Sequence, residues 1–83
     1  MIPLYGFLEG DTIGLLLLGG EDETVGALAA RLQAAARLRV APRARVAVIY
    51  KGATLDDDMT LARAGLAKLD RFDVVALGDE ASR

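Results

Sequence analysis

The stretch from Asp22 to Val40 limits most strongly what this chain can fold into, because it has the pattern of a single amphipathic helix. Its apolar residues are Val25, Leu28, Ala29, Leu32 and Ala36. They recur three and four positions apart, which is the spacing of one buried helical face. Thr24 comes just before the pattern, where its hydroxyl can accept a hydrogen bond from an unpaired N–H group of the first turn. Strand-like runs lie on both sides of this helix, so we expect a small α+β fold.

Four runs outside the helix are typical of strands. They are residues 2–8, 12–18, 46–51 and 72–77. The first two are predicted to form a hairpin, in which Pro3 restricts the first strand to an edge of the sheet or to its first residues. Gly19 and Gly20 end the second strand, and we expect them to supply the freedom in φ for a sharp turn into the helix.

Between the last two strands, the sequence predicts a turn followed by one short helical turn. The first covers residues 54–58 and the second residues 59–64. Asp58 or Thr60 is expected to cap this helical turn, because both side chains accept hydrogen bonds from backbone N–H groups. Gly65 is expected to end it.

Charge is strongly segregated along a chain whose net charge is only −2. Residues 1–23 carry five acidic residues and no basic one, whereas residues 24–51 carry six basic residues and no acidic one. Four of these basic residues follow the helix: Arg37, Arg39, Arg43 and Arg45. Either they complement the helix C-terminus and keep the surface soluble, or they pair with carboxylates on another protein. No aromatic residue is interleaved and the whole chain is acidic, so we expect no nucleic acid partner.

The second predicted strand is apolar on both faces. Ile13, Leu15 and Leu17 lie on one face, and Leu16 and Leu18 lie on the other. A single helix can cover only one face of a small sheet. The other face is therefore covered by a loop or exposed to a partner, and the alternation alone does not decide which set of side chains points inward.

The residues needed for chemistry are missing. The chain has no histidine and no cysteine, and Ser82 is its only serine, so it offers no nucleophile–base pair and no imidazole or thiolate metal site. The three aspartates at residues 56–58 lack the alternate spacing and the distant glutamate of a calcium-binding loop. Carboxylates in predicted turns stay ionised rather than acting as general acids. We expect no catalytic residue, no cofactor and no metal ion.

Location and domain organisation follow from similar observations. The longest apolar run is far shorter than the roughly 20 residues that span a bilayer, and the N-terminus lacks the basic region of a secretory signal. The absence of cysteine suits a reducing compartment. We expect a cytoplasmic protein without a membrane partner, with a single domain over residues 1–78 and a disordered tail over residues 79–83.

The order of hairpin, helix, strand, short helical turn and strand resembles the ubiquitin-like β-grasp fold. Residues 48–77 can be laid against the second half of ubiquitin without a gap, with Gly52 and Leu55 in its Gly-x-x-Leu turn. This resemblance implies a four- to five-stranded mixed sheet with one main helix packed on one face. It also implies a core that includes Val48, Leu61, Leu66, Phe72 and Val74. Ile49 and Val75 would then lie on the face that ubiquitin-like domains commonly present to partners. The chain has no terminal Gly-Gly, so we do not expect a covalent modifier.

Several short motifs, in their order and spacing, resemble the toluene monooxygenase system protein B family over nearly the whole chain. They are Pro3, the turn with Glu9 and Asp11, Val40-Ala41-Pro42-Arg43, Asp58-Met59-Thr60, Ala64-Gly65-Leu66 and Asp73-Val74-Val75. Members of this family are small ubiquitin-like subunits of bacterial multicomponent diiron hydroxylases. The chain departs from the family pattern in a shorter segment between Tyr50 and Asp58 and in its leucine-rich second strand.

The family resemblance implies a non-catalytic accessory subunit of an aromatic or alkene monooxygenase hydroxylase, packed on the large catalytic subunit. The residues expected at this interface are Ile13, Leu15, Leu17, Arg39, Arg43, Arg45, Ile49 and Val75. The alternative is a stand-alone ubiquitin-like adaptor that resembles the small proteins of bacterial type VII secretion systems. Self-association of the isolated chain through its apolar strand is a further possibility.

Overall fold

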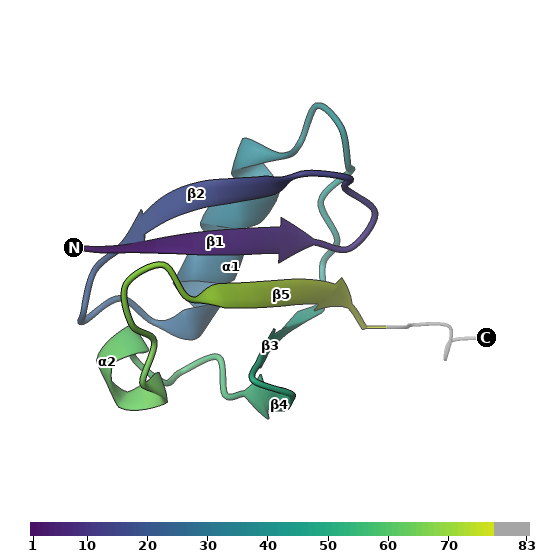
Figure 1. Ribbon diagram of the computed structural model, residues 1–83. Helices are drawn as coiled ribbons and strands as arrows, with labels where there is room; N and C mark the ends of the chain where they lie inside the picture. Colours follow the sequence, from purple (N-terminus) through teal and green to yellow (C-terminus); the bar gives the residue numbers. More distant parts are fainter. Residues whose placement is uncertain (78–83) are drawn as a thin grey trace.

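The computed structural model describes residues 1–77, which form a five-stranded mixed sheet with helix α1 packed on one face (Figure 1). The elements are β1 (Ile2–Leu8), β2 (Gly14–Gly19), α1 (Val25–Ala35), β3 (Val46–Tyr50), β4 (Ala53–Leu55), α2 (Leu61–Ala64) and β5 (Arg71–Ala76). The strand order is β2-β1-β5-β3-β4, and β1 pairs with β5 in parallel while the other neighbours are antiparallel. The expected mixed sheet and main helix are confirmed. The predicted domain boundary at residue 78 and the tail over residues 79–83 lie outside the described residues.

Helix α1 begins where the sequence predicts, and its first N–H groups all find acceptors. The Thr24 hydroxyl accepts a hydrogen bond from the Ala27 N–H at 3.1 Å. The N–H groups of Val25 and Gly26 donate to the carbonyls of Met59 and Asp57, at 2.8 and 2.9 Å. Because these groups lack partners within a helix, the loop before α2 completes the N-terminus of α1 and joins the two halves of the chain.

The short helix α2 follows the predicted pattern, and its cap is now identified. Thr60, rather than Asp58, is the N-cap, because its hydroxyl accepts from the Arg63 N–H at 3.2 Å. Gly65 ends the helix in the left-handed conformation, with φ of 82°, which glycine adopts without steric cost.

Pro3 is the second residue of β1, so of its two predicted placements, an edge strand or the first residues of a strand, the second is confirmed. Two other local predictions are wrong. Thr54 and Leu55, expected in a turn, belong to β4, where Leu55 pairs with Val48. Gly19 and Gly20 do not adopt positive φ. A Cβ atom at Gly19 would lie 2.5 Å from Leu61 Cδ1, so glycine there allows α2 to approach the end of β2.

The core lies between α1 and the inner face of the sheet, and both predicted sets of core residues are buried. The helix contributes Val25, Leu28, Ala29, Leu32 and Ala36, and the second half of the chain contributes Val48, Leu61, Leu66, Phe72 and Val74. At the centre of this core, α1 crosses β1 over Gly6. A Cβ atom at Gly6 would lie 2.7 Å from Phe72 Cζ and 3.1 Å from the methyl groups of Leu32. The absence of a side chain at this position therefore sets how closely helix and sheet can pack.

The hydroxyl of Tyr50 fixes the loop that follows α2. It donates to the Asp70 carboxylate and lies 3.2 Å from the Gly65 carbonyl oxygen. Asp70 also accepts from the Ala67 N–H at 2.9 Å. The hydrogen bond between the two side chains lowers the pKa of Asp70 and raises that of Tyr50. The carboxylate is thus held ionised at the point where the chain enters β5.

We predict that Gly6→Ala lowers the free energy of unfolding by about 1–3 kcal/mol, the usual effect of overpacking a core. Urea unfolding measures this change. Gly20→Ala is the matched control, since the nearest atom to an added Cβ there is 3.8 Å away and φ is not positive. Equal stabilities of the two variants would contradict the tight contact at Gly6.

We also predict that Tyr50→Phe lowers stability more at neutral pH than in acid. The folded pKa of Asp70 lies below its ordinary value of 3.8, so its ionised form contributes stability above that value. This contribution is lost as the pH falls through the folded pKa. Thermal unfolding from pH 7 to pH 2 should show the difference from the unsubstituted chain shrinking in acid. Tyr5→Phe, which removes the hydroxyl of an exposed tyrosine, should show no such trend.

Candidate partner-binding surface

The face of the sheet opposite α1, called here the outer face, has no helix over it. In Figure 1 this face is turned toward the viewer and α1 lies behind β1 and β2. Side chains alternate along a strand, so the neighbours of the buried residues point outward. The outward side chains at the middle of the sheet are Pro3, Tyr5, Phe7, Leu16, Leu18, Ile49, Arg71, Asp73 and Val75.

Interactions within the chain occupy the centre of the outer face. The Arg71 guanidinium stacks on the Phe7 ring, 4.0 Å from its centroid, and its Nε lies 3.0 Å from Asp73 Oδ1. The Phe7 ring lies over Gly14 of the neighbouring strand, where a Cβ atom would be 2.5 Å from the ring. The charges of Arg71 and Asp73 are thus paired and the Phe7 ring is covered. The exposed apolar surface of the outer face lies on either side of these three residues.

The first apolar surface lies on β1 and β2, and it corrects the predicted orientation of β2. Leu15 and Leu17, expected to face a partner, pack instead against the core. Leu16 and Leu18 point outward and are 56% and 50% exposed. Ile13, also predicted at the interface, precedes β2 and is exposed. Whether it contacts a partner stays a prediction.

The backbone edge of β2 that faces away from β1 is partly occupied by Arg31. The Leu18 carbonyl accepts a hydrogen bond from Arg31 Nη2 at 2.5 Å, so the main-chain groups of Leu18 point away from β1. Main-chain groups alternate in direction along an antiparallel pair, so those of Leu16 point the same way. β2 carries no charged residue, whereas the opposite edge strand, β4, has only three residues. Short strands and charges usually protect an edge. On β2 the Arg31 guanidinium protects the Leu18 carbonyl, so the main-chain groups of Leu16 are the less protected part of this edge.

The second apolar surface contains Ile49 and Val75, on the other side of Arg71 and Asp73. Both side chains are half-buried on the outer face, as the sequence predicts. Ile49 pairs with Asp73, and Val75 pairs with Ala47. The structure therefore separates this pair from Leu16 and Leu18, and contact of Ile49 and Val75 with a partner stays a prediction.

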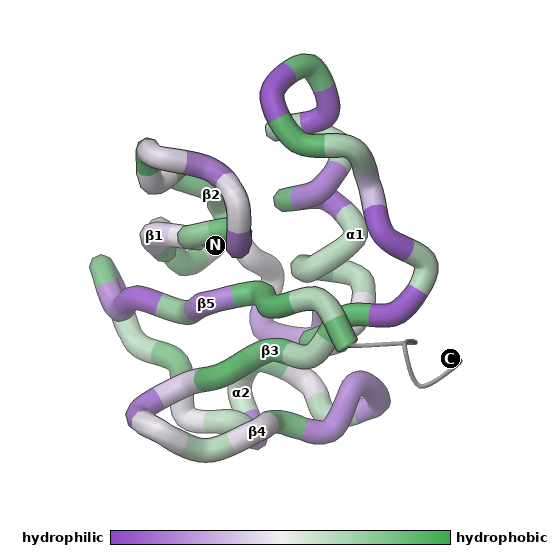
Figure 2. The backbone as a smooth tube through the Cα atoms, turned by 90° about the vertical axis from the view of Figure 1, so that its right-hand side faces the viewer, coloured by the Kyte–Doolittle hydropathy of each residue, from purple (hydrophilic) through white to green (hydrophobic). Residues whose placement is uncertain are grey.

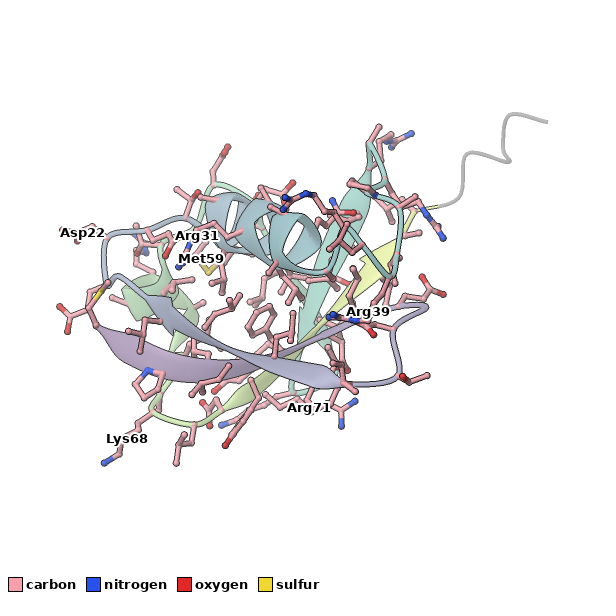
Figure 3. The ribbon with its side chains drawn as sticks, turned by 90° about the horizontal axis from the view of Figure 1, so that it is seen from above. Asp22, Arg31, Arg39, Met59, Lys68 and Arg71 are labelled. Carbon is pink, nitrogen blue, oxygen red and sulfur yellow. The ribbon has the colours of Figure 1, made fainter. Side chains whose placement is uncertain are left out.

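The predicted arginine cluster divides into structural and exposed members. Arg39 forms a bidentate ion pair with Asp11, at 3.0 Å from Nε to Oδ1 and 2.9 Å from Nη2 to Oδ2. The Asp11 side chain is only 2% exposed. The hydrogen bonds from Arg39 lower the pKa of Asp11 and raise that of Arg39, despite the opposing effect of burial. Arg39 thus fixes the hairpin turn to the chain after α1 (Figure 3), and its predicted role at an interface is untested.

The other three arginines of the cluster are exposed. Arg37 Nη1 donates to the Ala34 carbonyl at 3.0 Å, at the C-terminus of α1, where a positive charge is favourable. Among the described residues, Arg43 and Arg45 form no side-chain ion pair. The backbone of Arg43 is held by the Gln33 amide, which donates to its carbonyl and accepts from its N–H, at 3.1 and 2.7 Å.

Several exposed apolar residues were not identified from the sequence as interface residues. Tyr5 lies beside Leu16 on the outer face and is exposed. Because side chains alternate along a strand, a buried Leu4 would have placed Tyr5 on the opposite, outer face. Leu38, between two arginines, is 91% exposed. Its position outside the helical pattern was the signal for its exposure.

The structure shows open surfaces rather than an enclosed site. A groove of about 380 Å³ lies between α1 and the start of β3, with Arg45 and Asp57 among its lining residues, and it is open to solvent. Within residues 1–77, no three acidic side chains gather closely enough to hold a metal ion. Over the same residues, neither helix has the length and apolarity needed to cross a bilayer.

Comparisons with known proteins agree with a ubiquitin-like fold. A ubiquitin of Caldiarchaeum subterraneum is 26% identical and superposes with a TM-score of 0.77, covering 93% of this chain and 94% of that one. A chain of the toluene 4-monooxygenase HD complex with the inhibitor 4-bromobenzoate is 25% identical, with a TM-score of 0.83, covering 92% and 98%. No curated protein matches the chain significantly.

The predicted ubiquitin-like β-grasp fold is confirmed by these superpositions. The sequence pattern of the family described as toluene-4-monooxygenase system protein B (TmoB) matches residues 1–75. The match runs from the start of the chain to Val75, the fifth residue of β5. It therefore includes every core residue and the outward-facing residues named above. The chain therefore belongs to the toluene-4-monooxygenase system protein B family.

Proposed function

We propose that this chain is the non-catalytic accessory subunit of a multicomponent diiron hydroxylase that oxidises aromatic or alkene substrates, and that it packs on the large catalytic subunit in the cytoplasm. The observation that carries the proposal is membership of the family, with a match over residues 1–75. A chain of the toluene 4-monooxygenase complex also has the same fold over 92% of this chain. The partner in this proposal is the cognate hydroxylase.

The acidic side chains support a role without chemistry of its own. A general acid needs a carboxyl group with a raised pKa, which holds the proton at neutral pH. In this chain, hydrogen bonds instead lower the pKa of the Asp11, Glu23 and Asp70 carboxyl groups. Each of these carboxylates is ionised and holds a loop in place. With no histidine or cysteine in the sequence, the chain would contribute surface and rigidity to the complex.

The outer half of the β1–β2 hairpin is the surface best suited to pack on a large subunit. Leu16, Leu18 and Tyr5 form an exposed apolar area, and the main-chain groups of Leu16 adjoin it, next to the Leu18 carbonyl that Arg31 occupies. Burial of such an area supplies the non-directional part of the binding energy, and strand pairing fixes the orientation. Arg43 and Arg45 lie on the α1 side of the sheet, beside Gln33 and the groove next to α1, so their electrostatic attraction would act outside this apolar area.

We predict that Leu16→Lys combined with Leu18→Lys prevents co-purification of the hydroxylase. The long lysine side chains leave the sheet intact but place two charges in the apolar contact, as protected edge strands do. The chain is tagged and co-expressed with the cognate hydroxylase subunits, and the retained proteins are read by mass spectrometry and iron content.

The control adds the same two charges elsewhere. Ala27→Lys with Ala30→Lys places them on the exposed side of α1, away from the outer face, and should retain the hydroxylase. Loss of binding in the control as well would show a general effect of charge. If the unsubstituted chain retains no iron-containing hydroxylase, the proposed function is wrong.

A further inference from the structure

The loop over residues 36–45, called here the arginine loop, holds the most exposed large apolar side chain among the described residues. This side chain is Leu38, at 91% exposure. Figure 2 shows the loop rising beyond the rest of the backbone, with hydrophobic and hydrophilic residues alternating along it. A leucine in this position gains nothing from the fold, because it contacts no core.

Specific contacts on both sides of Leu38 hold the arginine loop. Val40, two residues later, is buried and lies against Gly10 of the hairpin turn. Arg39 is fixed by its bidentate pair with Asp11. The backbone N–H groups of Arg39 and Val40 both donate to the Ala36 carbonyl at 2.9 Å. The leucine is therefore carried on a turn with little freedom.

The far end of the arginine loop is fixed equally well. Gln33 is buried in α1, and its amide bonds both the N–H and the carbonyl of Arg43. A buried glutamine needs partners for both ends of its amide, and here a single residue of the loop supplies them. The loop is thus held in one conformation before any partner arrives, which lowers the entropic cost of binding.

The charge around Leu38 indicates what kind of surface it meets. Residues 24–51 contain no acidic residue. The charge of Arg39 is compensated by Asp11, whereas Arg37, Arg43 and Arg45 stay exposed, with no ion pair to another described residue. A complementary surface would carry carboxylates around an apolar centre.

We propose that Leu38 is an anchor residue, which inserts into an apolar pocket bordered by carboxylates on the large hydroxylase subunit. The inference rests on the proposed function and adds a second contact to it. The arginine loop stands beside the edge of β2, between α1 and the hairpin turn, rather than on the outer face (Figures 1 and 3). Anchor residues of this kind combine exposure in the free protein, a fixed backbone and full burial in the complex.

The experiment measures binding of the purified chain to the purified cognate hydroxylase by calorimetry at low and high salt. Leu38→Ala should weaken binding at least about tenfold, the effect of losing a buried anchor, and should leave the salt dependence unchanged. Leu38→Met keeps an apolar side chain and should bind within a few-fold of the unsubstituted chain. Arg43→Glu should weaken binding and reduce its salt dependence, because it replaces a positive charge in the contact with a negative one.

The matched charge control is Arg63→Glu, at an exposed arginine of α2 on a different part of the fold, which should bind normally. Thermal unfolding of each variant checks the fold, which Leu38→Ala should not change because the side chain is exposed. Binding of Leu38→Ala within twofold of the unsubstituted chain overturns the inference and leaves the proposed function standing. Failure of the unsubstituted chain to bind overturns both. If Leu38→Ala alters self-association of the isolated chain instead, a second copy is the occupant and the inference is wrong.

Discussion

The close packing of α1 over Gly6 and Phe72 is the contact on which the rest of this structure depends. β1 and β5 are the two strands that pair in parallel at the middle of the sheet, and α1 crosses them at a distance that a side chain at Gly6 would not allow. That approach buries Leu28 and Leu32 completely and brings the start of α1 within reach of the carbonyls of Asp57 and Met59. Apolar burial and the satisfaction of the helix N-terminus thus require the same geometry.

One helix covers one face, and the chain treats its outer face unevenly. At the centre, Arg71 stacks on Phe7 and pairs with Asp73, so the two charges stay hydrated at their edges while the ring is covered. Such a pair on a sheet surface contributes little stability. Its effect is spatial, because it divides the outer face into the area around Leu16 and Leu18 and the area around Ile49 and Val75. Only the first lies on β2, the longer edge strand, where Arg31 occupies the Leu18 carbonyl and the main-chain groups of Leu16 point away from β1. Exposed leucines beside such an edge are better suited to docking than scattered exposed residues.

Patterns with a long period could be predicted from the sequence, and features decided by single contacts could not. The helical spacing and the Thr24 cap located α1, and the resemblance to ubiquitin located the five core residues of the second half, since each depends on several residues at once. The orientation of β2 could not be read, because both of its faces are leucine and only its pairing with β1 places Leu15 and Leu17 inward. The role of Gly19 could not be predicted either, because it depends on a contact that is distant in the sequence. Glycine is required there because a Cβ atom would clash with Leu61, 42 positions later, and not because of the φ angle of Gly19.

The arginines show how the same residue type takes different roles within nine residues of chain. Arg39 has an enclosed carboxylate within reach, so its guanidinium becomes part of the fold and lowers the pKa of Asp11. Arg43 has its backbone fixed by Gln33 but its side chain exposed. The ion pair of Arg39 and the hydrogen bonds with Gln33 hold the arginine loop in place. The exposed side chains of this loop therefore project from a fixed backbone. In a chain that has no enclosed site in its described part, a rigidly presented surface is the property that the fold can offer to a larger complex.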